Sequence, residues 1–274
     1  MLDPISMTII SKITGWLCDK LLYKLDNLGN LEHGLMEKEI FSNLIECAEK
    51  IEKEANPFCK RQCFLELICA ILRPLQSELL LGALEEGEQT DKKIKDKEEA
   101  TNYIFGQEIT EKYIWPLDCK LEYDASQHEL YFYKDIILVV PWNRSVSYDR
   151  YIQALCNYGN GKPQPWKQDA GNHQVVLWLP WRIAFADNGR HSIAAGILNA
   201  ASTPLKPTAI YDMSSVLDLI DTDGEYFYYK ETKETKRKIA RVKSGRYAAV
   251  FKIGCYINKC EEKFKIENLS KSSQ

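Results

Sequence analysis

A guanidinium, an imidazole and a hydroxyl follow one another in residues 187–192, which spell Asp-Asn-Gly-Arg-His-Ser. The apolar residues before this stretch predict a strand over 183–186, and those after it predict a helix over 190–200. Gly189 permits the positive φ or the close backbone approach that such a tight turn needs. The first turn of a helix presents unpaired N–H groups and the positive end of the helix dipole, which attract anions. These residues therefore predict a phosphate-binding turn.

Four residues of this stretch are the predicted phosphate or nucleotide ligands, namely Asn188, Gly189, Arg190 and Ser192. A guanidinium and a helix N-terminus both suit an oxyanion. The alternative is a simple strand-to-helix connector, in which the same residues only close the turn.

His191 and Asp187 are the two candidate catalytic residues. An imidazole can act as a general acid or base, or donate to an anion, near neutral pH. The Asp187 carboxylate either caps the turn or holds a magnesium ion beside a phosphate. The other histidines, His33, His128 and His173, show no metal-ligand spacing, so no metal site built from them is predicted.

Composition and charge are those of an ordinary folded protein. Of 274 residues, 45% are hydrophobic and 27% are charged, and the formal net charge is −3. Any nucleic-acid-binding surface must therefore be local. Nine cysteines, an odd number, favour reduced thiols in a cytoplasm over a secreted disulfide framework. The most apolar run, residues 64–84, is interrupted by charges and a proline, so we expect a cytoplasmic protein without a membrane span.

The first third of the chain has helical periodicity. Helices are expected near residues 9–22, over 40–51 and over 58–84, with a break at Asn56-Pro57 and a kink or split at Pro74. We therefore divide the chain into a helical region over 1–100, whose charged stretch 85–101 is a linker, an α/β domain over 102–265 and a polar tail over 266–274. The N-terminal helices are expected to contact a protein partner or a second copy of the chain.

The second half changes to strand periodicity, which predicts an α+β fold. Helices are expected over 147–158, 190–200 and 214–220, and residues 159–172 form a loop whose Trp166 could stack on a base. Strands are expected over 120–123, 129–133, 135–140, 174–179, 183–186, 207–211, 225–230 and 247–257.

Four sequence boxes succeed one another in this half. They are Pro-Trp-Asn-Arg at 141–144, Gly-Lys-Pro-Gln-Pro at 161–165, Asn-Gly-Arg-His-Ser-Ile-Ala-Ala at 188–195 and a proline-led apolar strand at 204–214. Their order resembles the ParB/sulfiredoxin superfamily over roughly residues 136–220. The Asn-Gly-Arg-His-Ser core also resembles an uncharacterised bacterial family.

The resemblance implies a ParB/sulfiredoxin-like mixed α/β domain whose turn-helix box binds nucleotide or other phosphate groups. A nucleoside triphosphate is the candidate cofactor, and magnesium held by Asp187 is a second candidate. ParB proteins bind and hydrolyse CTP, related members phosphorylate serine or act as nucleases, and sulfiredoxins use ATP. It also implies that Arg144 and Gln164, from the two preceding boxes, face the same ligand as the turn over 189–192.

Three departures narrow what the resemblance implies. The turn holds no cysteine, which excludes a sulfinic acid reductase. Arg190 stands where ParB proteins carry an acidic residue, and Ser192 where they carry a second arginine, which weakens the expectation of metal-assisted CTP hydrolysis. No helix-turn-helix follows, which argues against a centromere-binding partition protein.

A basic region lies between residues 230 and 246, where eight basic residues are flanked by tyrosines. Its candidate nucleic-acid-binding residues are Lys236, Arg237, Lys238 and Arg241. Basic residues beside aromatic ones can contact a backbone and stack on bases, but a solvated hairpin loop has the same composition.

Two further clusters have plainer interpretations. Cys59, Cys63 and Cys69 share one helical segment and are more typical of a core than of zinc ligands, because no second pair of ligands lies nearby. The acidic residues around Gly224, at 218, 221, 223 and 225, favour a solvated turn over the metal site of a nuclease.

Two hypotheses follow. In the first, the chain is a cytoplasmic bacterial enzyme or switch that binds a nucleotide and carries out NTP hydrolysis or phosphoryl transfer. In the second, it is a nucleic-acid-binding protein or nuclease of a mobile-element or phage-defence system. A degenerate fold kept for protein–protein contact remains a third alternative.

Overall fold

The computed structural model describes residues 37–86, 102, 104–114, 128–139, 148–231 and 235–272. Arg144, the strand expected over 120–123, the helix expected near 9–22 and most of the charged linker lie outside these ranges. After a helix over residues 37–54, the elements in chain order are α2 (Pro57–Glu86), α4 (Gln107–Ile109), the π-helix η2 (Thr110–Ile114), β1 (Ile136–Leu138), α5 (Tyr148–Asn157), β2 (Val175–Leu179), β3 (Ile183–Ala186), α6 (Arg190–Leu198), β4 (Ala209–Asp212), α7 (Ser214–Leu219), β5 (Ile220–Thr222), β6 (Tyr226–Lys230), β7 (Lys236–Arg241) and α8 (Gly245–Ser272). The predicted α+β class is confirmed.

The break between the first two described helices falls at Asn56, as the sequence predicts. The Asn56 side-chain oxygen accepts a hydrogen bond from the Phe58 N–H at 3.0 Å, so it satisfies one of the donors left open at the start of α2. Pro57 is the first residue of α2, where its missing N–H costs no helical bond. The helix continues through Pro74, so of the two outcomes expected there, a kink or a split, the split does not occur.

A four-stranded sheet in the order β1-β3-β2-β4 organises the second half of the molecule. β3 runs antiparallel to β2, whereas the outer pairs β1–β3 and β2–β4 are parallel. Side chains alternate between the two faces of a strand. In β3, Ile183 and Phe185 face one hydrophobic core, and Ala184 and Ala186 face the other. The sheet therefore separates two cores.

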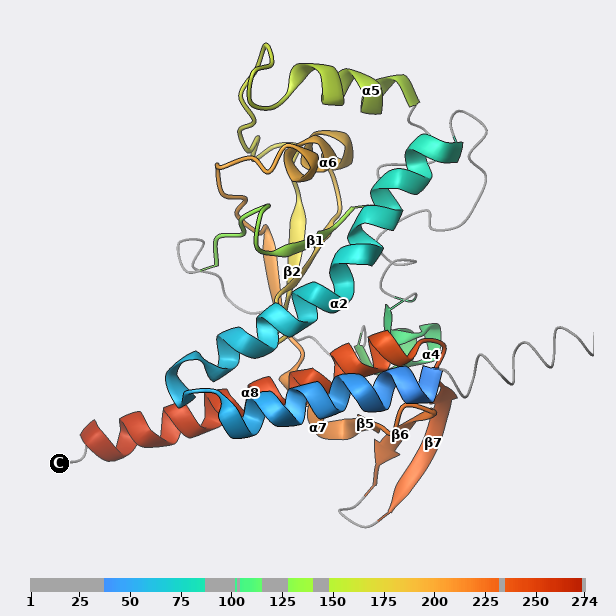
Figure 1. The fold of residues 1–274 in the computed structure, drawn as a ribbon, viewed down its shortest axis with the longest axis vertical. Helices are drawn as coiled ribbons and strands as arrows, with labels where there is room; N and C mark the ends of the chain where they lie inside the picture. The colour runs from blue at the N-terminus through green and yellow to red at the C-terminus, as the bar shows by residue number, and fades with distance from the viewer. Residues whose placement is uncertain are drawn as a thin grey trace, which may run out of the picture.

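One face of the sheet packs against the long helices. Phe41 of the first described helix, Phe64 of α2 and Phe251 of α8 belong to the same buried cluster as Phe185. Figure 1 shows α8 and the helix over 37–54 running below the sheet, with α2 crossing from them toward α5. The N-terminal helices thus share a core with the α/β part of the chain.

The opposite face carries α5 and α6, which Figure 1 shows above the sheet. Tyr151 of α5 and Ile193 and Ala194 of α6 pack with the small residues Ala184 and Ala186. Because these alanines leave room above β3, α6 lies close to the strand that leads into it. This packing fixes where the first turn of α6 points.

A second sheet, antiparallel with the order β5-β6-β7, lies at the other end of the molecule. Of the acidic residues around Gly224, Asp223 and Glu225 lie in the turn between its first two strands, as the sequence predicts. Asp218 lies instead in α7, and Asp221 lies in β5, where it pairs with Lys236 and Lys252. Asp223 accepts hydrogen bonds from the N–H groups of Glu225 and Tyr226, both at 2.9 Å. It therefore closes the turn.

The expected strand over Tyr247–Ile257 is wrong, because this stretch lies inside α8. Its apolar residues are buried on several sides of the helix, so they form a continuous run that a buried strand would also show. A side chain at Gly254 would collide with the indole of Trp181, so the glycine allows this close contact. α8 continues to Ser272 and includes most of the expected polar tail.

The expected strand over Glu129–Tyr133 is also wrong. Only Leu130 pairs, in an isolated bridge with Leu205, and the chain then turns. The Asp135 carboxylate accepts the Tyr131 N–H at 2.7 Å, and this side-chain bond replaces a strand ladder.

Of the three α2 cysteines expected in the core, Cys69 packs against it, whereas Cys59 and Cys63 do not belong to either hydrophobic cluster. Cys59 is exposed, while Cys63 and Cys69 are half-buried. Within the described ranges, no group of three or more His, Cys, Asp or Glu side chains is arranged to hold a metal ion. Nor does any helix in those ranges combine the length and apolar character needed to cross a membrane.

Candidate functional site

The turn between β3 and α6 has the geometry that its sequence predicts. Gly189 adopts the left-handed conformation, with φ 71° and ψ 21°, and α6 begins at Arg190. The Asp187 N–H donates to the Gln174 carbonyl at 2.8 Å, which ties the turn to the start of β2. A side chain at position 189 would collide with the His173 ring and lie 3.0 Å from the Asn172 carbonyl oxygen. Glycine is therefore required both by the backbone angle and by the close approach of the neighbouring loop.

This turn forms one wall of a polar cleft of about 410 Å³, and α5 forms the opposite wall. We call it the α5–α6 cleft. Its lining includes the whole predicted stretch 187–192. The opposite wall includes Arg150, Gln153 and Asn157 of α5 and Tyr158, which directly follows this helix. Arg150 was not predicted from the sequence. Only its position on the facing helix brings it to the cleft.

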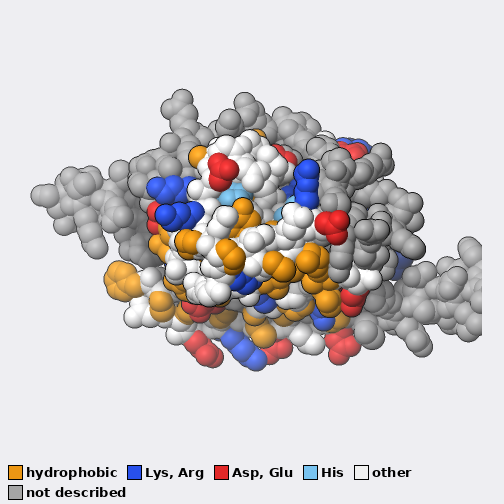
Figure 2. All heavy atoms as spheres, turned by 90° about the horizontal axis from the view of Figure 1, so that it is seen from above, with side chains coloured by type: hydrophobic (Ala, Val, Ile, Leu, Met, Phe, Trp, Pro, Cys, Tyr) orange, Lys and Arg blue, Asp and Glu red, His pale blue; other side chains and the backbone are white. Residues whose placement is uncertain are grey.

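Two arginines and one aspartate carry the charge of the α5–α6 cleft. The Arg190 Nε–H donates to the Asp187 carbonyl at 3.2 Å, which holds the guanidinium beside the turn. Arg150 is exposed on α5. Seen from above, histidine lies at the surface between two groups of basic side chains (Figure 2). A local positive field within a mixed surface suits a small anion better than a long polyanion.

The Ser192 hydroxyl is engaged in holding the adjacent loop. It forms a short hydrogen bond with His173 Nε2 and lies 3.4 Å from the Gly189 carbonyl. His173 Nδ1 accepts the Asp169 N–H at 2.9 Å, so Nε2 carries the ring proton and donates to Ser192. If Ser192 is a phosphate ligand, as the sequence predicts, its hydroxyl must exchange this bond to His173 for one to the phosphate.

The pair of His173 and Ser192 is not a nucleophile with its general base. A base would need a free Nε2 lone pair and a carboxylate at Nδ1, whereas here Nε2 is the donor and a backbone N–H occupies Nδ1. Burial lowers the pKa of His173 below its usual 6.5, against the opposing charge of Asp169, and so favours this neutral form. The two residues therefore position the start of α6.

Trp166 belongs to the core, so the expectation that it stacks on a base is wrong. Its side chain is 3% exposed, and its ring stacks on His173 with 5.3 Å between centroids. The indole N–H donates to the Ser192 carbonyl at 2.7 Å. Gly196 makes room for it, since a side chain there would lie 3.0 Å from the indole nitrogen. Trp166 therefore fixes His173 and the first turn of α6, which lie beside the cleft.

His191 lies beside a buried tyrosine. Its ring centroid is 5.9 Å from that of Tyr151, which is fully buried. The Tyr151 hydroxyl has no hydrogen-bond partner among the described residues. Burial raises the pKa of Tyr151 to about 12, so it stays protonated at neutral pH. His191, which lines the cleft, therefore has a buried, neutral phenol as its neighbour.

The other predicted ligands do not join this group. Gln164 is exposed, and its described contacts are backbone bonds to Gly159 and Asn157 that close the loop after α5. The cleft lining does not include it. Arg144 lies outside the described residues.

The basic residues of β7 are placed far from the cleft, on the second sheet. Lys236 pairs with Asp221 at 2.8 Å, and Arg237 pairs with Glu231 at 3.4 Å. The Lys238 ammonium lies 3.7 Å above the Tyr226 ring. The tyrosine faces on this side are thus covered by neighbouring cations, which leaves less aromatic surface for bases.

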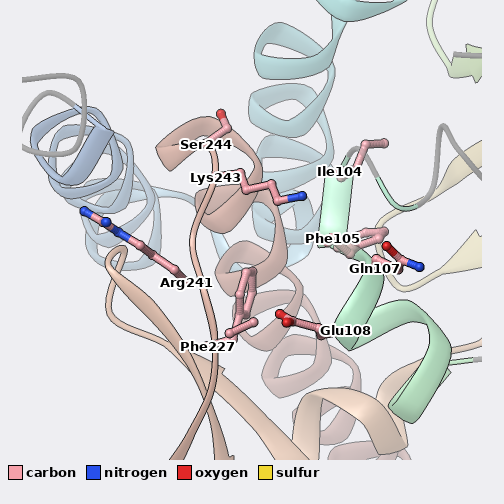
Figure 3. Close-up of a pocket in the computed structure, with 10 residues that line it drawn as sticks. Ile104, Phe105, Gln107, Glu108, Phe227, Arg241, Lys243 and Ser244 are labelled. Atoms are coloured by element: carbon pink, nitrogen blue, oxygen red, sulfur yellow. The ribbon is translucent and has the colours of Figure 1, made fainter. Parts of the chain in front are cut away.

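Arg241 lies at the rim of a smaller cavity of about 130 Å³. Phe105 and Phe227 supply its apolar side, and Lys243 and Glu108 its charges. Figure 3 shows Arg241 extending away from this space, with Glu108 directed toward Phe227. The four predicted nucleic-acid-binding residues therefore do not converge on one concave site.

The fold and the cleft define an α+β protein with a polar cleft at the N-terminus of a helix. Residues 26–264 match the family described as "Family of unknown function (DUF6710)", and the chain belongs to this family. Neither the curated proteins nor the solved structures include a match to it.

Proposed function

We propose that this protein binds a nucleotide, or another small molecule with a phosphate group, in the α5–α6 cleft. The single observation that carries the proposal is that residues 187–192 and Arg150 of α5 line one polar cleft of about 410 Å³. Backbone N–H groups of a helix N-terminus and two guanidiniums suit phosphate oxygens. The likeness to ParB/sulfiredoxin proteins supports the same ligand class.

Within the proposal, each residue has a separate task. Arg190 and the backbone N–H groups of the first turn of α6 bind phosphate oxygens, and Arg150 approaches from the facing helix. The Gly189 N–H already donates to Asn188 Oδ1 at 2.9 Å. His191 moves a proton, and the Asp187 carboxylate holds magnesium or a proton acceptor. NTP hydrolysis or phosphoryl transfer is the proposed reaction class, because such chemistry depends mainly on positioning and on stabilising charge.

A thermal-shift titration with nucleoside triphosphates, with and without magnesium, tests the proposal. A ligand that binds only the folded protein stabilises it by about 3 kcal/mol at a hundredfold excess over the dissociation constant. We expect one nucleotide to raise the melting temperature, and Arg190→Ala to abolish the shift. Arg241→Ala removes the same charge outside the cleft and should leave it intact.

The alternative proposal is a nucleic-acid-binding protein or nuclease. Lys238 and Arg241 are exposed and would extend the footprint beyond the cleft. Binding of an oligonucleotide would then fall steeply with salt, because each phosphate contact releases counterions. A steep salt dependence that Lys238→Ala and Arg241→Ala reduce favours this alternative. Nucleotide binding that ignores both variants favours the first proposal.

A further inference from the structure

A second charged cleft lies on the opposite side of the sheet from α5 and α6. It occupies about 480 Å³ between α2 and the turns that precede β1 and β3. We call it the α2 cleft. It shares no lining residue with the α5–α6 cleft.

Arg182 is built rigidly into the α2 cleft. Its Nε donates to Asp135 Oδ1 at 2.6 Å, and its NH2 group donates to the Glu129 carbonyl at 2.6 Å. Asp135 is 5% exposed and also accepts the Tyr131 N–H. Two hydrogen bonds to fixed acceptors therefore orient the guanidinium plane.

The backbone at Arg182 adds an independent observation. Its φ is 58°, in the left-handed region that a side chain other than glycine rarely adopts. Such strain persists where surrounding contacts impose it, and it clusters at ligand-binding positions. Glycine would satisfy the turn without strain. Since glycine has no side chain, the side-chain contacts of Arg182 are the reason for an arginine at this strained position.

α2 contributes two further arginines to the same space, Arg61 and Arg73. The Arg73 NH1 group donates to Gln76 Oε1 at 2.7 Å and to the Asp135 carbonyl at 3.4 Å, which holds its guanidinium beside the start of β1. With Lys134, four cations line the α2 cleft against the carboxylates of Glu66 and Asp135. Asp135 is already bonded to Arg182, and the Lys134 ammonium lies 4.5 Å from the Tyr131 ring centroid, so Glu66 is the lining carboxylate that stands outside the Arg182 pair.

We propose that the α2 cleft binds a small organic anion with carboxylate or phosphate groups, held by Arg61, Arg73 and Arg182. The planar guanidinium fork matches both kinds of oxyanion. Leu65 and the ring of Tyr133 border the charged groups and provide apolar contact for the rest of such a ligand. This site is independent of the proposed nucleotide cleft.

Cys69 provides a reporter inside the α2 cleft. Its thiol is half-buried there, 3.3 Å from the Lys134 carbonyl, and Cys47 is an exposed thiol that lines neither cleft. The experiment compares the alkylation rates of Cys69 and Cys47 by iodoacetamide, mapped by peptide mass spectrometry. Inorganic phosphate and citrate are titrated separately, which distinguishes a phosphate from a carboxylate preference.

We expect at least one of the two anions to slow Cys69 alkylation relative to Cys47 with a saturable dependence. Arg61→Gln should weaken this protection about tenfold, as the loss of a charge-assisted hydrogen bond does. Glu66→Gln should strengthen it, a gain that partial unfolding cannot imitate. Arg182 is left unchanged, because its removal would strand the buried Asp135 carboxylate.

Two results would overturn the proposal. One is a Cys69 to Cys47 ratio that neither anion changes in the wild-type protein. The other is protection that Arg61→Gln leaves unchanged and Arg190→Ala abolishes, because that pattern assigns the anion to the α5–α6 cleft. Equal melting temperatures of the wild type and Arg61→Gln establish that the variant is folded.

Discussion

The sequence predicts phosphate contacts both for residues of the α5–α6 cleft and for the basic strand β7, but the charged side chains of these two regions have different surroundings. In β7, Lys236 and Arg237 are paired with acidic residues, and Lys238 covers a tyrosine ring. In the cleft, Arg150 and Arg190 approach one concave space from two helices. The basic strand has more cations than the cleft, but only the cations of the cleft are placed so that they can contact one ligand.

The difference shows that charge density alone does not locate a binding site. Each cation of β7 mainly stabilises its own sheet, since surface ion pairs and cation–π contacts are local and weak. The cleft instead depends on a glycine conformation, a buried histidine and a tryptophan that hold the turn in place. Substitutions of these three supporting residues should therefore destabilise the protein more than substitutions of the charged residues of β7.

Gly189→Ala should have the largest effect. It places a side chain in the left-handed region and against the His173 ring, so the free energy of unfolding should fall by about 3 kcal/mol. Gly161→Ala is the matched control, because Gly161 has φ 72° with open space around it and should lose only about 1 kcal/mol. Urea unfolding measures both. Equal losses would contradict the close packing of turn and loop.

Asp221 tests how far the second sheet depends on its own ion pairs. Burial alone would raise the pKa of its carboxyl, but hydrogen bonds from Lys236 and Lys252 lower it from 3.8 to about 2. The stability from this depressed pKa is present above about pH 4 and is lost as the pH falls toward 2, about 2 kcal/mol in all. The stability gap between wild type and Asp221→Asn should therefore close over this range. A gap that is constant between pH 5 and pH 2 would show that the pairs contribute nothing.

His173→Phe separates hydrogen bonding from stacking behind the cleft. It keeps an aromatic ring against Trp166 but loses both imidazole bonds, which should cost about 1 kcal/mol at pH 7.5. In the wild type, unfolded His173 takes up a proton near pH 6.5 while the folded residue, with its lowered pKa, resists it. Stability should therefore fall as the pH drops below 6.5, and less so in the variant. Parallel pH profiles would argue against a neutral, buried His173.

Lys238→Ala and Arg241→Ala should have the smallest effects. Both side chains are exposed, so each change should alter the free energy of unfolding by less than about 0.5 kcal/mol. Neither should change nucleotide affinity. A large loss of affinity in either variant would move the binding site to β7 and reverse the comparison.

The sequence predicts the β3–turn–α6 unit well because its signals are local. Apolar strand residues, an Asn-Gly turn and a helical period lie within one short stretch. The helix α8 was missed because a buried helix and a buried strand share the same continuous apolar run. The break at Asn56-Pro57 was predictable because proline at the first helical position has a direct steric cause.

The supports of the cleft could not be predicted in the same way. His173 meets Ser192 across a loop, and no spacing rule links residues that meet only through the tertiary fold. Arg150 lies on the exposed side of α5, where an arginine is ordinary, and only the position of α6 gives it a role. Arg182 gives no signal in the sequence, because its backbone conformation is imposed by the turn between β2 and β3.

The most direct test of the central claim follows the assigned backbone amide N–H spectrum of the protein during titration with a nucleoside triphosphate and magnesium. We expect the amides over 188–192 and at Arg150 to shift together along one saturable curve, while those over 236–241 stay in place. Shifts that begin in 236–241, or no shift over 188–192 at any nucleotide concentration, would contradict it.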